Sequence, residues 1–294
     1  MHSFFRPEIV AAAILLLAPL FYAGFAPDHF ATIATRLPRV GRVATPALLS
    51  IPYALVALSF GVLRWEWLAL YALLPVGIAF LLDQARNVDA KVRGNWRDFL
   101  VLAALGLAVD LRWLEPAWPH GLAAAGKILL LDAGIYGFLS VRQLDGVGFD
   151  MRLKLHDIAL GLREFLFYAP VAILLGLALG FLHFHAQWPE PLRAIGAFVF
   201  TFVFIAIPEE VFFRGWLQNL LERRIGRSAA LVLTAILFGL AHWNKRTISF
   251  NWRYVLLASL AGIFYGRAWR SQRRVGASSI THATVDTLWS LWFR

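Results

Sequence analysis

Residues 195–213 read IGAFVFTFVFIAIPEEVFF, an apolar run in which two adjacent carboxylates stand near the end, Glu209 and Glu210. A helix that crosses the hydrocarbon core of a bilayer needs about 20 mostly apolar residues, and this run has that length. An ionisable side chain inside such a helix is costly, so its default interpretation is functional. The run therefore predicts a membrane-spanning helix that carries part of a functional site.

Similar runs recur along the whole chain. Hydrophobic residues make up 60% of the sequence and charged residues 16%, whereas a soluble domain has about 25% charged residues. Candidate spans are expected at residues 9–25, 46–62, 65–82, 99–118, 122–141, 165–184, 195–213, 229–243, 255–269 and 275–292. The sequence thus predicts an all-α, polytopic transmembrane helix bundle of about eight to ten spans.

The composition excludes several classes of protein. The hydrophobicity is too high for a disordered chain, and the absence of Cys excludes disulfides, thiolate catalysis and Cys-ligated metal centres. The net charge of +10 fits Lys and Arg in cytoplasmic loops and beside anionic lipid, which favours the lipid bilayer over nucleic acid as the partner. We therefore expect a multi-pass integral protein of the cell (plasma) membrane that binds no nucleic acid.

A more polar stretch at residues 150–163 divides the chain. Its apolar residues alternate with Arg152, Lys154, His156 and Asp157, a pattern that predicts a helix lying in the membrane interface. The spans before it carry few ionisable residues, and the spans after it carry carboxylates and histidines. We expect N-terminal transmembrane helices of unknown role at residues 1–149 and a functional core at residues 150–294.

The first ionisable group within the expected spans is Asp110, Lys127 and Asp132. An Asp–Lys pair between neighbouring helices can be a structural lock, and we favour this interpretation over an ion or proton path. A secondary transporter, in which these side chains and the later carboxylates line a polar path, remains an alternative.

The second group is the motif Glu209-Glu210-x-x-x-Arg214. Successive helical residues point about 100° apart, so the two carboxylates cannot do the same job. Glu210 and Arg214 are spaced i,i+4 and share a face, which suits an ion pair. Glu209 then faces elsewhere, with no local partner.

Two later spans supply imidazoles. Phe238 and His242 are four residues apart, as are His282 and Asp286, so each pair shares one helix face. One carboxylate, two imidazoles and an orienting carboxylate are the components needed to activate a water molecule. This group favours an enzyme over a transporter.

The three motifs, in this order on separate helices, resemble the CPBP family, the CAAX-protease and bacteriocin-processing (Abi) proteins. The resemblance covers roughly residues 150–294, which would form a CPBP-like intramembrane protease core, and it leaves the first five spans unexplained. It implies an intramembrane endopeptidase, a hydrolase that cleaves membrane-associated protein or peptide substrates.

The resemblance also assigns roles to the first two motifs. Glu209 would be the general base that activates water, and His242 would share that role. Glu210 and Arg214 would hold their helix in place, and Phe238 would be a structural member of the second motif.

In the third motif, His282 and the residue at Asp286 would stabilise the oxyanion of the tetrahedral intermediate. The family often has Asn at this last position. A carboxylate cannot donate a hydrogen bond to an oxyanion. Asp286 would therefore either stay protonated by burial or orient His282 and keep it cationic, and we favour the second role.

The same side chains leave other functions open. Glu209, His242 and His282 could form a His₂Glu zinc site, but the motif lacks the His-Glu-x-x-His spacing of many zinc proteases. The resemblance favours a glutamic-type mechanism without a cofactor, and zinc remains the alternative. A non-enzymatic membrane scaffold or immunity protein with the same fold is disfavoured because the motif residues are all present.

Overall fold

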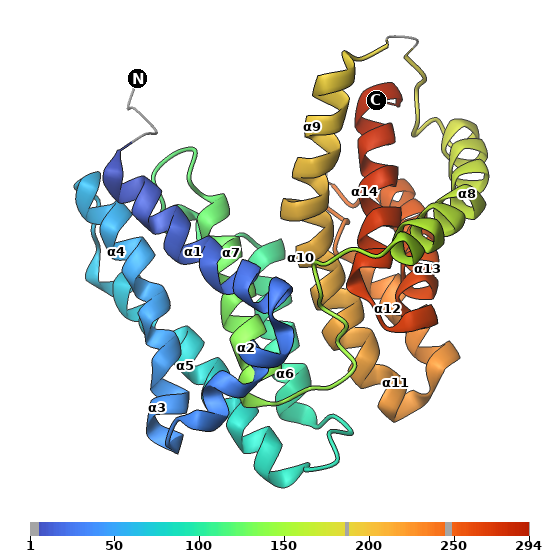
Figure 1. Cartoon of the computed structure of the whole chain (residues 1–294). Helices are drawn as coiled ribbons and strands as arrows, with labels where there is room; N and C mark the ends of the chain where they lie inside the picture. The colour runs from blue at the N-terminus through green and yellow to red at the C-terminus, as the bar shows by residue number, and fades with distance from the viewer. Residues whose placement is uncertain (1–5, 186–187, 245–248, 294) are drawn as a thin grey trace. The chain divides into compact units, whose positions relative to one another are not determined.

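The computed structural model describes residues 6–185, 188–244 and 249–293. Within these ranges the regular elements are helices, apart from an isolated β-bridge between Phe184 and Phe293, so the all-α prediction is confirmed (Figure 1). The chain divides into two compact units, Met1–Asp145 and Gly146–Arg294. Each unit is described by itself.

The first unit is built from short and long helices in succession. They are α1 (Pro7–Phe25), α2 (Pro27–Ile33), η1 (Ala34–Arg36), α3 (Arg39–Ala44), η2 (Thr45–Leu49), α4 (Ser50–Ser59), α5 (Trp65–Val88), α6 (Trp96–Asp110), η3 (Glu115–Ala117), α7 (Ala124–Ile135) and the π-helical η4 (Tyr136–Val141). Helix α7 packs against α1, α5 and α6 and is the most buried helix of this unit.

The second unit surrounds α14. Its elements are α8 (Leu155–Ala178), α9 (Pro191–Thr201), η5 (Phe202–Ala206), α10 (Ile207–Glu210), η6 (Val211–Gln218), α11 (Asn219–Ile225), α12 (Arg227–Leu240), α13 (Trp252–Gln272) and α14 (Val275–Trp292), of which η5 and η6 are π-helical. Helix α14 packs against α8, α9 and α13, and α12 packs along α13 (Figure 1). This arrangement brings the three sequence motifs together.

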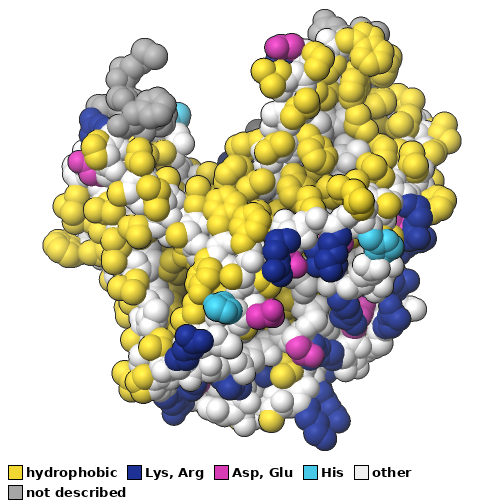
Figure 2. Space-filling view, in the orientation of Figure 1, with side chains coloured by type: hydrophobic (Ala, Val, Ile, Leu, Met, Phe, Trp, Pro, Cys, Tyr) yellow, Lys and Arg dark blue, Asp and Glu magenta, His cyan; other side chains and the backbone are white. Residues whose placement is uncertain are grey.

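Six helical segments in the described part of the chain are long and apolar enough to cross a membrane. They are Pro7–Phe25, Arg39–Ser59, Trp65–Val88, Ala124–Val141, Leu155–Ala178 and Pro191–Ile225. Large apolar side chains stay exposed on such helices, including Leu73 on α5 and Leu174 on α8, and hydrophobic side chains cover broad areas of the face in Figure 2. The chain is a multi-pass membrane protein.

Each of the ten predicted runs contains a helix, but fewer of them qualify as spans than expected. Helix α6 ends at Asp110 after 15 residues, and α12 has 14 residues. Helix α13 is long but carries Arg253, Arg267 and Arg270, while α14 carries His282 and Asp286. An apolar run in the sequence does not reveal where a helix turns, nor which face is polar.

The predicted interfacial helix at residues 150–163 differs in the structure. Residues 150–154 are not helical, and α8 begins at Leu155 and continues to Ala178. The Asp157 carboxylate accepts a hydrogen bond from the Lys154 N–H at 2.9 Å. Its two oxygens share the single Nε–H of Arg274, at 2.8 and 2.9 Å from Nε. Burial alone raises the pKa of Asp150, but hydrogen bonds from Arg152 and Arg274 lower that pKa below its ordinary value.

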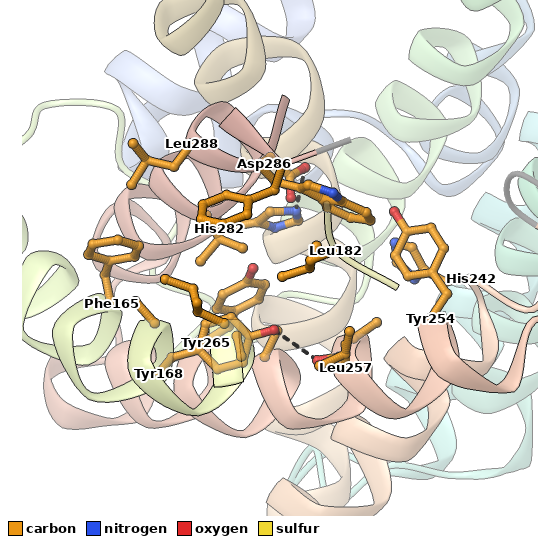
Figure 3. Close-up of a pocket in the computed structure, with 18 of the residues that line it drawn as sticks. Phe165, Tyr168, Leu182, His242, Tyr254, Leu257, Tyr265, His282, Asp286 and Leu288 are labelled. Atoms are coloured by element: carbon orange, nitrogen blue, oxygen red, sulfur yellow. Dashed lines mark hydrogen bonds and ion pairs between the residues drawn. The ribbon is translucent and has the colours of Figure 1, made fainter. Parts of the chain in front are cut away.

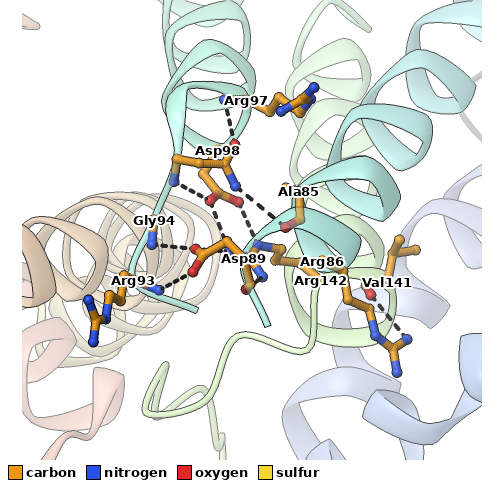
Figure 4. Close-up of polar contacts among 10 residues, drawn as sticks. Ala85, Arg86, Asp89, Arg93, Gly94, Arg97, Asp98, Val141 and Arg142 are labelled. Carbon is orange, nitrogen blue, oxygen red and sulfur yellow. Dashed lines mark hydrogen bonds and ion pairs between the residues drawn. The ribbon is translucent and has the colours of Figure 1, made fainter. Parts of the chain in front are cut away.

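A buried arginine ties the helix ends of the first unit together (Figure 4). Arg142, which is fully buried, donates from Nε and Nη2 to the two carboxylate oxygens of Asp98 at 2.8 and 3.1 Å. Its Nη2 also donates to Asp89 Oδ2 at 2.7 Å. Burial by itself raises the pKa of Asp89, but hydrogen bonds from two backbone N–H groups and the charge of Arg142 bring it below its ordinary value.

Replacing Arg142 with Ala is expected to lower the free energy of unfolding by about 3–5 kcal/mol, because it leaves the buried Asp98 carboxylate without its cationic partner. Thermal unfolding of the purified protein, followed by size-exclusion chromatography after heating, measures this loss. Arg93→Ala is the matched control, because the Arg93 side chain is exposed in the same loop. Equal unfolding temperatures for the two variants would contradict the prediction.

Candidate active site

The first motif lies where the helix changes from π-helical to α-helical hydrogen bonding and back. The short helix α10 carries Pro208, Glu209 and Glu210 and is flanked by the π-helical η5 and η6. Proline has no N–H to donate to the ladder, and π-helical turns are frequent at functional sites. The two carboxylates therefore lie in a helix whose backbone hydrogen bonding is irregular, unlike that of a regular spanning helix.

Glu210 is the buried centre of a charge network. Its side chain is fully buried, and Arg214 Nε donates to its Oε2 at 2.9 Å. His282 Nδ1 lies 2.9 Å from Oε1 and can donate only as N–H, because the ionised carboxylate accepts hydrogen bonds and donates none. Glu210 therefore joins η6 to α14 through two charge-assisted hydrogen bonds.

The other ring nitrogen of His282 faces two more carboxylates. His282 Nε2 lies 3.4 Å from Asp286 Oδ2 and 3.9 Å from Glu209 Oε2. The His282 side chain is 3% exposed, whereas those of Asp286 and Glu209 are 33% and 37% exposed. Three carboxylates around one buried imidazole favour its protonated, cationic form.

Glu209 is the less buried of the two adjacent carboxylates. Its Oε2 is shielded from solvent and has no hydrogen-bond partner among the residues that the structure describes. His282 Nε2 lies 3.9 Å from this oxygen. An oxygen with free lone pairs beside a histidine is the arrangement that a general base requires.

His242 lies just after the end of α12, and its tautomer follows from its neighbour. His242 Nδ1 is 2.8 Å from the Phe238 carbonyl oxygen, so Nδ1 carries a proton, and in the neutral ring Nε2 is the acceptor. Within the described ranges, no hydrogen bond or ion pair joins His242 to Glu209. The predicted sharing of the base role is therefore not a direct contact.

His242, His282 and Asp286 all border one apolar cavity of about 140 Å³ (Figure 3). Its walls also include Phe165 and Tyr168 of α8, Tyr254, Leu257 and Tyr265 of α13, Leu288 of α14, and Leu182 of the loop after α8. The cavity can hold an apolar group beside the polar cluster. The sequence analysis did not single out the three tyrosines, since each is an ordinary aromatic residue of an apolar run.

Residues 191–288 match the family model of the Rce1-like type II CAAX prenyl endopeptidases. The chain carries an Rce1-like domain. The match confirms the predicted resemblance, extends from α9 into α14, and includes all the motif residues. No significant match to the chain was found among curated proteins or among solved structures. The family of the domain implies a membrane protease.

The zinc alternative can be compared with the geometry of the Rce1-like domain. Within the described ranges, no group of three or more His, Asp or Glu side chains is arranged so that it could hold a metal ion. Glu209, His242 and His282 as they stand do not fit the four-coordinate site that zinc prefers.

The first ionisable group lies outside the Rce1-like domain. Lys127 Nζ is 3.3 Å from Glu115, a partner that the sequence analysis did not consider. Asp132 is 1% exposed, and its carboxylate has no hydrogen-bond partner among the described residues. Glu115, in the turn after α6, is thus a carboxylate partner of Lys127 that the expected Asp–Lys lock between neighbouring helices did not include.

Removing Arg214 is expected to lower both the yield of folded protein and its activity. The Arg214→Ala variant leaves Glu210 buried with one hydrogen bond fewer, and breaking a buried ion pair costs about 3–5 kcal/mol. Arg224→Ala is the matched control, because Arg224 is exposed in α11. Membrane yield and unfolding temperature measure the effect, and wild-type values for Arg214→Ala would contradict the network's structural role.

Proposed function

We propose that the chain is an intramembrane endopeptidase that hydrolyses a peptide bond of a membrane-associated protein or peptide. The observation that carries the proposal is the placement of Glu209 Oε2, which lacks a hydrogen-bond partner among the described residues and lies 3.9 Å from His282. His282 also lines an apolar cavity inside a membrane protein. The Rce1-like match supports the same reaction class.

Glu209 is the general base of the proposed reaction. It takes a proton from water as the water oxygen bonds to the carbonyl carbon, and the C=O electron pair moves to the carbonyl oxygen. The tetrahedral intermediate then re-forms the C=O bond and breaks the C–N bond. The leaving amine receives the proton held by Glu209, so protons and electrons balance.

His282 stabilises the negative charge that develops on the carbonyl oxygen. Its Nδ1–H is engaged by Glu210, so only Nε2–H of the cationic ring can donate toward the reacting centre. Asp286 at 3.4 Å orients that nitrogen and favours the positive charge. Fixed donors of this kind commonly contribute about 3–4 kcal/mol to lowering the barrier.

His242 assists from the cavity wall. With Nδ1 committed to the Phe238 carbonyl, Nε2 can accept a hydrogen bond from the attacking water or from the substrate. A water-mediated link to Glu209 is compatible with the absence of a direct contact within the described ranges. The residue therefore positions water, and Glu209 takes the proton.

The alternative functions have less support. A transporter whose polar path is lined by Asp110, Lys127, Asp132, Glu209 and Glu210 gives no role to the buried His282 among its carboxylates. A scaffold or immunity protein has no need of a carboxylate beside that histidine. We propose the plasma membrane as the site of action, with the substrate reaching the cavity from the bilayer.

Glu209→Gln is expected to lower cleavage by about 100-fold or more, because the amide cannot accept the water proton. Cells making wild type and Glu209→Gln at matched membrane levels are compared by mass spectrometry of protein termini. Termini that occur only with the wild type identify both the activity and its substrates. A repeat with a chelator tests the zinc alternative, which predicts loss of those termini.

Glu190→Gln is the matched control, because Glu190 is an exposed carboxylate at the start of α9. It should give the wild-type set of termini. Identical termini from Glu209→Gln and wild type, with both proteins folded, would refute the proposed mechanism.

At the third motif, Asp286→Asn is expected to keep more activity than Asp286→Ala. The amide can still accept from His282 and can itself donate to an oxyanion, whereas Ala does neither. Initial cleavage rates of the two purified variants measure the difference. A higher rate for Asp286→Ala would contradict an orienting role for Asp286.

A further inference from the structure

The ring of Tyr265 lies parallel to the ring of His282. The two ring centroids are 4.7 Å apart, and the planes differ by 15°. Tyr265 is 1% exposed and comes from α13, whereas His282 comes from α14. In Figure 3 both side chains lie at the same cavity. Tyr265 therefore covers one face of the proposed oxyanion-stabilising ring.

Helix α13 is held close to its neighbours by glycines on either side of Tyr265. A Cβ atom at Gly262 would lie 2.9 Å from the Cα of Ala235, and one at Gly266 would lie 2.3 Å from Leu231 Cδ1. Gly-x-x-x-Gly spacing of this kind lets membrane helices approach closely. The close contact of α13 with α12 fixes the position from which Tyr265 reaches His282.

The hydrogen bond to Glu210 at Nδ1 and the contact with Asp286 at Nε2 do not by themselves fix the plane of the His282 ring. A ring anchored through Nδ1 can still tilt, and a tilt would move Nε2 away from Asp286 and Glu209. A flat neighbour stacked on the ring opposes that tilt, and such aromatic pairs are worth about 0.5–1.5 kcal/mol beyond the area they bury. Phe238 meets both rings edge-on, at 5.7 Å from His282 and 5.6 Å from Tyr265.

We propose that Tyr265 is a positioning residue that fixes the plane of His282, so that Nε2 stays directed toward Asp286 and Glu209. This inference rests on the proposed peptidase function. The ring, and not the hydroxyl, performs the role, because the contact is a parallel stack. A ring that keeps the stack therefore preserves the role, and an aliphatic side chain of similar size does not.

The test uses purified full-length protein and an internally quenched farnesylated CAAX peptide as the probe. Tyr265→Leu should lower kcat by on the order of 10-fold to 100-fold, because small misplacement of a catalytic group is costly. The KM should stay within about twofold, since the ring acts on the transition state. Tyr265→Phe should restore kcat to within about threefold of the wild-type value, because it keeps the stack.

Phe264→Leu is the matched control, because it removes a neighbouring ring of α13 that is not part of the cavity wall. Its kcat should equal that of the wild type. A wild-type kcat for Tyr265→Leu would overturn the inference, and so would an equal loss for the Phe and Leu variants, which would assign the role to the hydroxyl.

A second measurement separates this inference from the proposed function. In protein labelled with ¹⁵N-histidine, the His282 signals are assigned by their loss in His282→Gln. Their chemical shifts should be the same in the wild type and in Tyr265→Phe. In Tyr265→Leu the signals should be shifted or broadened. Unchanged signals in Tyr265→Leu overturn the positioning role. Wild-type protein that cleaves neither the probe nor cellular proteins refutes the peptidase function, whatever the spectra show.

Discussion

The fully buried carboxylate of Glu210 is the constraint on which the second unit depends. A charge removed from water must be paired and hydrogen-bonded, and Glu210 meets this need through Arg214 and His282. Losing either partner leaves the buried charge only partly compensated, and breaking a buried ion pair costs several kcal/mol. The requirement determines which face of α14 turns toward α10 and η6. His282 is thereby presented to Glu209, which belongs to the proposed chemistry.

Two adjacent glutamates acquire different properties from the helix geometry alone. Because they point about 100° apart, Glu210 is buried in its ion pairs, whereas Glu209 keeps a side chain that is 37% exposed. The π-helical turns on both sides of α10 accompany this separation. Pairs of carboxylates with different surroundings are a recurrent way to obtain different roles at one site. Here one carboxylate stabilises the fold, and the other is available to a reactant.

The sequence predicted those features that follow from local spacing. The helical class, the i,i+4 pairs and the family resemblance all depend on residues close together in one helix or on motif order. Contacts between helices could not be predicted in this way. Lys127 pairs with Glu115 because of a turn after α6. Tyr265 stacks on His282 because two glycines let α13 pack closely against α12. Composition likewise did not reveal that α8 begins at Leu155.

The central claim is that Glu209 activates a water molecule for peptide hydrolysis. Cleavage of a defined farnesylated CAAX peptide in H₂¹⁸O, analysed by mass spectrometry, tests this most directly. The account predicts one ¹⁸O atom in the newly formed carboxylate with wild-type protein and no product with Glu209→Gln. Product without ¹⁸O, or equal labelled product from both proteins, would contradict it.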